Sequence, residues 1–393
     1  MSDSLVGNVL IVQSGSTSPV ANATLSGIIS GALNYEEIEE IFGSVDGFCG
    51  ILNDDLIDLA AQSQQVIRDL SFTPGVALGT FNWEERSKEE LDELMAAFER
   101  HNIRYLFVIG DQDAQQIALE ITRHAKTANY EMRVISLPND GANQLPITDH
   151  SLGYGSVAKC IASTVRELTL YLSGIANHDC VNILEIPNNS PWLVPSALLL
   201  KSAQDAKAPQ ILLSAAEPFD ETQFLEEIQN ALKNNRCCNI VTPASLIDEN
   251  GNYITNDSVS AAQKLGNLIR ETMEVRVFTT SLGNLQLTAA SKLSKTDVDE
   301  AFACGSKAVN FAMDGITGKM VTILRAEGNH YAAEFGVADL ENIVGEKKTL
   351  PKHWFDENGT LNQNFGKYLY PLIVGSVSCP EENGLPKFAA LKA

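Results

Sequence analysis

The sequence predicts an α/β protein with mainly parallel sheets, and three observations carry this prediction. Short apolar runs rich in β-branched residues are each followed by a polar loop and then by an amphipathic helical pattern. The chain has 393 residues, enough for two domains, and 44% of them are hydrophobic. The clearest strand–loop–helix unit covers residues 133–168. Because ligands bind at the carboxyl ends of strands in such sheets, we expect the site in its loop.

Composition excludes several classes of partner. The formal net charge is −22, from 28 basic and 50 acidic residues, which argues against nucleic acid and anionic membranes because both bind clustered Lys and Arg. The seven cysteines form no C-x-x-C pair and no zinc-like spacing, so we expect reduced, structural thiols. No segment reads as a signal peptide or as a membrane span. We therefore expect a cytoplasmic protein.

The chain opens with a strand–loop–helix unit. Residues 9–13 read as a strand, Gly15 and Ser16 lie in a loop of glycine and hydroxyl residues, and residues 20–33 read as a helix. Such a loop can present helix N–H groups to an anion, or it can simply cap the helix. The residues by themselves leave both interpretations open.

The same pattern continues along the chain. Further strands are expected at residues 38–45, 105–109, 181–186, 210–214, 239–242 and 320–324, and further helices at 55–70, 84–101, 155–172 and 295–315. Asp111 and Asp113 follow one expected strand, and Asp140 follows another. These three carboxylates could bind a hard cation through oxygen, or they could be solvated loop residues.

The loop after residue 137 carries a family resemblance. The segment LPITDHSLGYGSVAKCIASTVRE is similar to the one that follows the catalytic loop of pyrophosphate-dependent phosphofructokinases, where the loop reads P-K-T-(V/I)-D-N-D. Pro138 and Asn143 match this pattern, whereas Asn139 and Asp140 replace its Lys and Thr. Ala142 stands at the position of the catalytic Asp. The frame of the loop is kept while its catalytic residues differ.

Other positions of the family's ligand pattern also differ. Gly15 matches the first glycine of the donor loop, but Ser16 replaces the second. Asp113 fits the Asp that marks pyrophosphate users, whereas Asp111 departs from the pattern. The remaining replacements are Asn82, Cys180 and Leu287, where the family has cations, Asn188, in a segment that has lost the sugar-phosphate Arg, and Ala216, where the family has a Glu that holds a sugar hydroxyl.

The resemblance spans nearly the full length and implies two doubly wound, Rossmann-like lobes that exchange segments. We expect the donor-side lobe at residues 1–152 plus 295–340. The sugar-side lobe is expected at residues 153–294 plus 341–393.

The replacements predict a phosphofructokinase-like pseudoenzyme, catalytically inactive, with a regulatory, assembly or scaffold role and no cofactor. Loss of a general base alone lowers rates by ~10²–10⁴. One alternative is an active diphosphate–fructose-6-phosphate 1-phosphotransferase-type enzyme with an altered donor or substrate, which would need Mg²⁺. Another is a small-molecule sensor that uses the retained cleft. His150, the histidine nearest the loop, is interpreted as a structural residue.

The resemblance also implies association between chains. The helix expected at residues 155–172 carries Val157, Ile161, Val165 and Leu168 at helical spacing. That stripe suits either a subunit interface or the core of one chain. We expect a homo-oligomer, as a dimer, or a hetero-oligomer with a paralogue.

Overall fold

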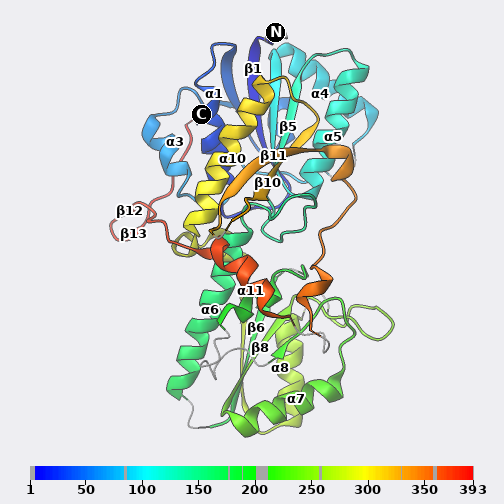
Figure 1. The fold of residues 1–393 in the computed structure, drawn as a ribbon, viewed down its shortest axis with the longest axis vertical. Coiled ribbons are helices and arrows are strands. Elements are labelled where there is room, and N and C mark those ends of the chain that lie inside the picture. Colours follow the sequence, from blue (N-terminus) through cyan, green and yellow to red (C-terminus); the bar gives the residue numbers. More distant parts are fainter. Residues whose placement is uncertain are drawn as a thin grey trace. The chain divides into compact units, whose positions relative to one another are not determined.

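A computed structural model describes residues 5–83, 86–175, 178–187, 189–200, 211–255, 259–328, 330–356 and 361–392. The apolar runs of the first 138 residues form one sheet with two strands from residues 319–339. Among the described residues, the strand order of this sheet is β11-β10-β5-β4-β1-β2-β3 (Figure 1). The strands are β1 (Gly7–Ser14), β2 (Ile38–Ser44), β3 (Leu56–Asp58), β4 (Ile103–Gly110), β5 (Arg133–Pro138), β10 (Lys319–Arg325) and β11 (Ala333–Asp339). The edge strands β3 and β11 pair antiparallel, and the others pair parallel.

The chain divides into two compact units. Unit 1 comprises Met1–Ser156, Leu287–Lys348 and Val374–Ala393, and unit 2 comprises Val157–Gln286 and Thr349–Ile373. The expected boundaries had assigned residues 153–156, 287–294, 341–348 and 374–393 to the second lobe, but the structure places all of these segments in unit 1. Backbone hydrogen bonds explain the last difference, because Lys295 N and Thr296 N donate to Gly375 O and Val374 O.

Both faces of the unit 1 sheet are covered by helices. Along β1, Val9 and Ile11 join a core formed with α1 (Ala21–Ala32), α3 (Gln64–Leu70) and α10 (Lys295–Met313). Leu10 and Val12 face the opposite way, into a core formed with α2 (Phe48–Leu52), α4 (Lys88–Arg100) and α5 (Gln112–Thr127). This alternation follows from the two-residue period of a strand, and it explains why the central strands are apolar throughout.

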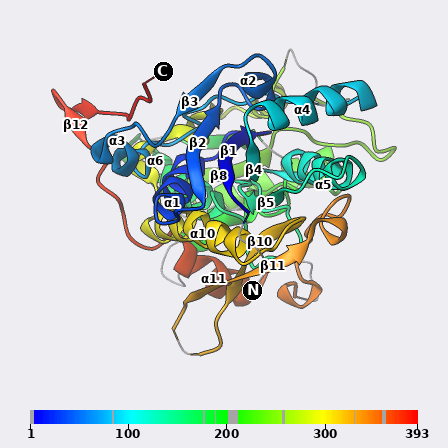
Figure 2. The ribbon, with the colours of Figure 1, turned by 90° about the horizontal axis from the view of Figure 1, so that it is seen from above.

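Helices α1 and α10 lie side by side (Figures 1 and 2), and two glycines permit their close approach. A Cβ on Gly27 would lie 2.0 Å from the carbonyl oxygen of Phe302, and one on Gly305 would lie 2.3 Å from that of Thr24. Neither position can therefore carry a side chain without separating the helices.

Unit 2 is built around a smaller, wholly parallel sheet. Its described strands are β6 (Cys180–Ile186), β7 (Ile211–Leu212), β8 (Cys237–Pro243) and β9 (Arg276–Ser281), in the order β7-β8-β6-β9. Helices α7 (Glu221–Asn234) and α8 (Ala261–Thr272) contribute buried apolar residues to its core. The chain passes from unit 1 to unit 2 near the start of α6 (Tyr154–Ile175). The prediction of an α/β fold with mainly parallel sheets is confirmed.

The remaining described elements are short. They are α9 (Leu285–Thr288), α11 (Gln363–Leu369), the pair β12 (Glu381–Glu382) and β13 (Leu385–Pro386), and 3-10 turns at Val194–Leu200, Ala290–Lys292, Leu340–Asn342, Lys352–Trp354 and Tyr370–Ile373. Within the described ranges, none of the helices is both long and apolar enough to cross a membrane.

The helix expected at residues 55–70 is wrong in its first half. Residues Leu56–Asp58 form the edge strand β3, and the helix α3 begins only at Gln64. The Asp58 carboxylate accepts hydrogen bonds from Ala60 N (2.9 Å) and Ala61 N (3.1 Å), which stabilises a turn at the place where a helix was expected.

Candidate functional site

The candidate site lies in unit 1, at the carboxyl ends of its parallel strands. From β1 the chain proceeds to β2 on one side, whereas β4 and β5 lie on the other side. The order of the sheet therefore reverses between β1 and β4. Ligands in open α/β sheets bind at such a reversal, so the loops after β1, β4 and β5 are the ones to examine.

Asp111 joins the loops after β1 and β4. Its carboxylate accepts a hydrogen bond from Ser16 N at 2.8 Å, and it caps α5 by accepting from Asp113 N at 3.2 Å. Gly15 adopts φ +80°, and a Cβ there would lie 2.2 Å from Asp111 Oδ1. Thr80 Oγ1 donates to Gly15 O at 2.8 Å. The structure thus brings together the predicted positions Gly15, Ser16 and Asp111, while the Asp113 side chain is exposed.

Asp140 forms the centre of the loop after β5. Its Oδ1 accepts from Ala142 N at 2.9 Å and its Oδ2 from Gln144 N at 2.5 Å. The residue is 8% exposed. Burial raises the pKa of Asp140 to about 6, and the negative charge of Asp111 acts in the same direction, against the two hydrogen bonds and Lys348. A buried carboxylate therefore titrates near neutral pH in this loop.

Two asparagines shape the same loop. Asn143 adopts φ +57°, which asparagine tolerates better than most residues, and its Oδ1 accepts from Ser151 N at 2.9 Å. Asn139 Nδ2 donates to Thr24 Oγ1 at 2.8 Å, whereas Asn139 Oδ1 is buried and has no partner within the described part of the chain. Asn139 therefore keeps one acceptor atom available at the edge of the sheet.

The suggested cation site is not supported. Across the described ranges, no group of three or more His, Cys, Asp or Glu side chains is arranged to hold a metal ion. Asp111 and Asp140 direct their oxygens to backbone N–H groups of the loops, and Asp113 is exposed. These three carboxylates do not make a protein site for a resident metal.

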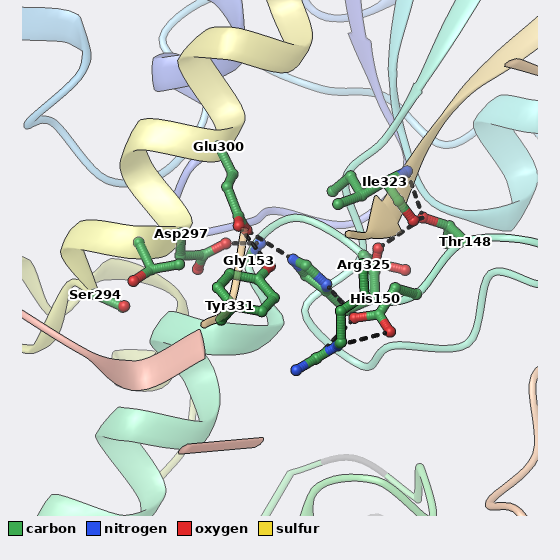
Figure 3. Close-up of polar contacts among 12 residues, drawn as sticks. Thr148, His150, Gly153, Ser294, Asp297, Glu300, Ile323, Arg325 and Tyr331 are labelled. Atoms are coloured by element: carbon green, nitrogen blue, oxygen red, sulfur yellow. Dashed lines mark hydrogen bonds and ion pairs between the residues drawn. The ribbon is translucent and has the colours of Figure 1, made fainter. Parts of the chain in front are cut away.

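A buried ion network holds the segment that follows the loop (Figure 3). It consists of Asp149, His150, Glu300, Arg325 and Tyr331. His150 Nδ1 lies 3.0 Å from Asp149 Oδ2, and its Nε2 lies 2.8 Å from Glu300 Oε2. Arg325 Nη2 binds Asp149 Oδ2 at 2.9 Å, and Tyr331 donates to Glu300 Oε1 at 2.5 Å. The network joins the loop, α10 and the β10–β11 hairpin of unit 1.

The charges of the network alter its pKa values. Burial by itself would lower the pKa of His150, but hydrogen bonds and negative charge from Asp149 and Glu300 outweigh it and raise that pKa to about 9. Burial likewise opposes ionisation of Asp149, yet hydrogen bonds from His150 and Arg325 hold its pKa well below the usual range. His150 is thus a charged, structural residue with two partners, in agreement with the structural interpretation of its sequence position.

Lys348 supplies a cation beside the loop that sequence reasoning missed. Its backbone N donates to Gln144 O at 2.8 Å, and its ammonium group donates to Thr148 O at 3.0 Å and to Asp149 O. Burial lowers the pKa of Lys348 to about 8, although Asp149 and Asp140 act to raise it. No local motif marks this lysine, because it reaches the loop from a segment about 200 residues away.

Comparison with known proteins decides the family. The family model "Phosphofructokinase" matches residues 8–312. The chain belongs to the phosphofructokinase family. It is 29% identical over 401 residues to a pyrophosphate–fructose 6-phosphate 1-phosphotransferase of Halomonas elongata, covering 98% of this chain and 96% of that protein.

Solved structures of the family show the same fold. The pyrophosphate-dependent phosphofructokinase of Nitrosospira multiformis superposes with a TM-score of 0.91 at 28% identity, covering 98% of this chain and 97% of that one. The corresponding protein of Marinobacter aquaeolei gives 0.89 at 30% identity, covering 98% and 96%.

These likenesses contradict the predicted pseudoenzyme. Relatives that match almost the whole chain are named as phosphotransferases, so a catalytically inactive regulatory or scaffold protein is the wrong interpretation. The prediction rested on side chains at single positions, whereas the match extends over nearly the whole chain. The alternative of an active phosphotransferase fits the comparisons better.

The other predicted positions of unit 1 carry neutral side chains. Asn82 is exposed in the segment after Gly79. Leu287 is half-buried in α9. Ala142 is 8% exposed within the Asp140 turn, where its backbone N, not its side chain, makes the hydrogen bond.

Three of the predicted positions belong to the part of the sequence around unit 2. Ala216 is exposed in the loop after β7, and Asn188 lies outside the described residues. Cys180 is 1% exposed and is the first residue of β6, so it lies at the amino end of that strand.

Glu185, near the carboxyl end of β6, has a structural role that the sequence did not reveal. Its Oε2 accepts from Ala262 N at 2.9 Å, at the first turn of α8, and its Oε1 accepts from Ser281 Oγ at 3.1 Å. A carboxylate at a helix N-terminus is stabilised by the helix dipole. The residue therefore fixes α8 and β9 against β6.

Proposed function

We propose that this chain is an active phosphotransferase of the phosphofructokinase family that uses an altered donor or acceptor. The observation that carries the proposal is the near full-length likeness, in sequence and in fold, to proteins named as pyrophosphate-dependent phosphofructokinases. The reaction class follows: a phosphoryl group leaves a phosphoanhydride donor and is transferred to the hydroxyl of a small acceptor.

Asp140 is the group we assign to proton removal. It lies two residues before Ala142, in the same loop, and its pKa of about 6 matches the range in which a general base works at neutral pH. As the acceptor oxygen bonds to phosphorus and the P–O bond of the donor breaks, the hydroxyl proton passes to Asp140. The two hydrogen bonds from Ala142 N and Gln144 N hold the carboxylate in place.

Neutral residues at two positions of the family's ligand pattern support a change of substrate. Asn82 and Leu287 stand where the resemblance implies arginines, and the chain carries a net charge of −22. Each charge-assisted hydrogen bond to phosphate contributes roughly 1.5–3 kcal/mol. A site without such bonds favours an acceptor with less negative charge than fructose 6-phosphate, such as an unphosphorylated sugar or polyol.

The test is a phosphorus NMR screen for transfer. Pyrophosphate, triphosphate and ATP, each with Mg²⁺, are offered with fructose 6-phosphate and with neutral hexoses, pentoses and polyols. We expect acceptor-dependent loss of donor with at least one neutral acceptor at a higher rate than with fructose 6-phosphate. Asp140→Asn lowers that rate by ~10²–10⁴, whereas Asp92→Asn, which changes an exposed carboxylate on α4, leaves it unchanged.

Two outcomes would contradict different parts of the proposal. Transfer to none of the acceptors would overturn the proposed activity. Efficient transfer to fructose 6-phosphate that survives Asp140→Asn would retain the activity but reject both the altered acceptor and the assigned base.

The expected oligomer stays a prediction. Of the stripe on α6, Val157, Ile161 and Val165 are buried within the single chain, so these residues give no argument for an interface. Leu170 and Tyr171 on the same helix are 76% and 55% exposed. Light scattering of the full chain would decide between a monomer and the predicted dimer, and copurification would detect a paralogous subunit.

A further inference from the structure

Cys180 and Cys237 form a pair of thiols at the amino edge of the unit 2 sheet. They begin the neighbouring parallel strands β6 and β8, and they are register partners. Their Sγ atoms lie 2.7 Å apart. This separation is shorter than an ordinary contact between two sulfur atoms that are not bonded.

The backbone geometry suits a covalent bond between them. Adjacent strands lie ~4.7–4.9 Å apart, inside the ~4.4–6.8 Å window of Cα separations seen in disulfides. A disulfide bond is ~2.05 Å long, so the sulfur atoms need to approach by only ~0.6 Å. Side-chain rotation supplies that distance without moving the strands.

The two thiols differ in exposure. Cys180 is 1% exposed, whereas Cys237 is half-buried, with its Sγ 3.9 Å from Leu172 O on α6. Cys238 is the next residue along β8 and belongs to the apolar core with α7 and α8. It therefore points to the other face of the sheet. An oxidant from solvent meets Cys237 first, and Cys180 is the thiol beside it.

We propose that Cys180 and Cys237 are a redox modification site, which forms a reversible intramolecular disulfide when a peroxide oxidises Cys237. The inference concerns the amino end of β6 and does not rest on the proposed phosphotransfer.

The reaction balances with hydrogen peroxide as the oxidant. The Cys237 thiolate attacks one peroxide oxygen, the O–O bond breaks, and a sulfenic acid and hydroxide form. Cys180 sulfur then attacks the sulfenic sulfur, its proton passes to the departing hydroxide, and water leaves. In sum two thiols and one peroxide give one disulfide and two waters. Burial raises the pKa of Cys180 to about 12, so it acts as the second thiol and not as the first.

Non-reducing peptide mapping tests the proposal on the full chain. The protein is titrated with hydrogen peroxide, free thiols are blocked, and the digest is analysed by mass spectrometry. We expect one cross-linked peptide that joins Cys180 to Cys237, with the thiol count of the unfolded protein falling from seven to five and returning to seven after dithiothreitol. The cross-link should raise Tm by several degrees, because it closes a loop of 57 residues.

Variants separate the pair from the other cysteines. In Cys180→Ser, the cross-link is lost and Cys237 is trapped by dimedone as a sulfenic acid. In Cys238→Ser, the matched control on the same strand, the cross-link forms as in the parent protein. Oxidation of Cys237 to a sulfinic acid while Cys180 stays a free thiol would overturn the proposal. A cross-link between chains, or to any other cysteine, would overturn it as well.

Discussion

The segment after β5 has two halves, and different kinds of contact hold them in place. Residues 139–144 form a polar turn held by hydrogen bonds of Asp140 and the two asparagines. Residues 148–152 are fixed by the buried ion network and by Lys348. The contrast teaches that the exit of the loop is fixed by buried ion pairs, whereas the turn before it, which contains the proposed base Asp140, is held by hydrogen bonds alone.

Removal of one partner from the network should give the largest effect on stability. Glu300→Ala leaves the His150 cation and the Tyr331 hydroxyl buried without their shared acceptor, and we expect a loss of ~3–5 kcal/mol in the free energy of unfolding. Denaturant unfolding measures it.

The matched control is Glu341→Ala. Its ion pair with Arg123 is exposed, with side chains 66% and 62% accessible, and such pairs contribute ~0–1 kcal/mol. Equal losses in the two variants would show that the network does not hold the loop exit.

The second largest effect should be a pH dependence of stability that comes from the titration of His150. Its pKa is raised from 6.5 to about 9, so the folded protein binds more protons than the unfolded chain between these values. The contribution of His150 to the free energy of unfolding is therefore fully present below pH 6.5 and is lost as the pH rises through about 9. The loss is about 3 kcal/mol at most. Lys348 opposes this above pH 8, because its pKa is lowered from 10.5 to about 8.

Thermal unfolding from pH 6 to pH 9 measures the effect. We expect Tm to fall over this range in the parent protein and to change much less in His150→Gln. In Lys348→Met the fall should continue more steeply above pH 8, because the opposing group is gone. A parent Tm that rises from pH 6.5 to 9 would contradict a charged His150.

A smaller effect should come from Gly15, in the loop after β1 that contacts Asp111. Gly15→Ala and Gly345→Ala both place a side chain at positive φ, +80° and +84°, which costs roughly 1–2 kcal/mol. At Gly15 the new Cβ also meets Asp111 Oδ1 at 2.2 Å, whereas at Gly345 it meets open space. We expect Gly15→Ala to be less stable than its control by a further ~1–3 kcal/mol. Indistinguishable unfolding curves would reject the contact between the loops after β1 and β4.

The local pattern of apolar residues predicted the central strands well and the edge strands poorly. The runs at residues 9–13, 105–109 and 181–186 lie within β1, β4 and β6, because strands buried on both faces are continuously apolar. The edge strands β3 and β11 were missed, since half-exposed strands with acidic and glycine residues carry no such signal.

The site was predictable only where its residues directly follow an expected strand. Gly15, Ser16, Asp111 and Asp140 were located from the ends of expected strands, and the structure brings their loops together. The partners of His150 were not found, because Glu300 lies 150 residues further along the chain and Arg325 and Tyr331 are more distant still. Burial also gave Asp140 its raised pKa, which no motif records.

The pH dependence of phosphoryl transfer by the parent protein and by Asp140→Asn tests the central claim most directly. With the best donor and acceptor from the screen, the parent rate should rise with pH and reach half its plateau near pH 6, as Asp140 loses its proton. The variant should be slower by ~10²–10⁴ and should lack that step. A variant that keeps the parent rate and the same midpoint would show that another group removes the proton.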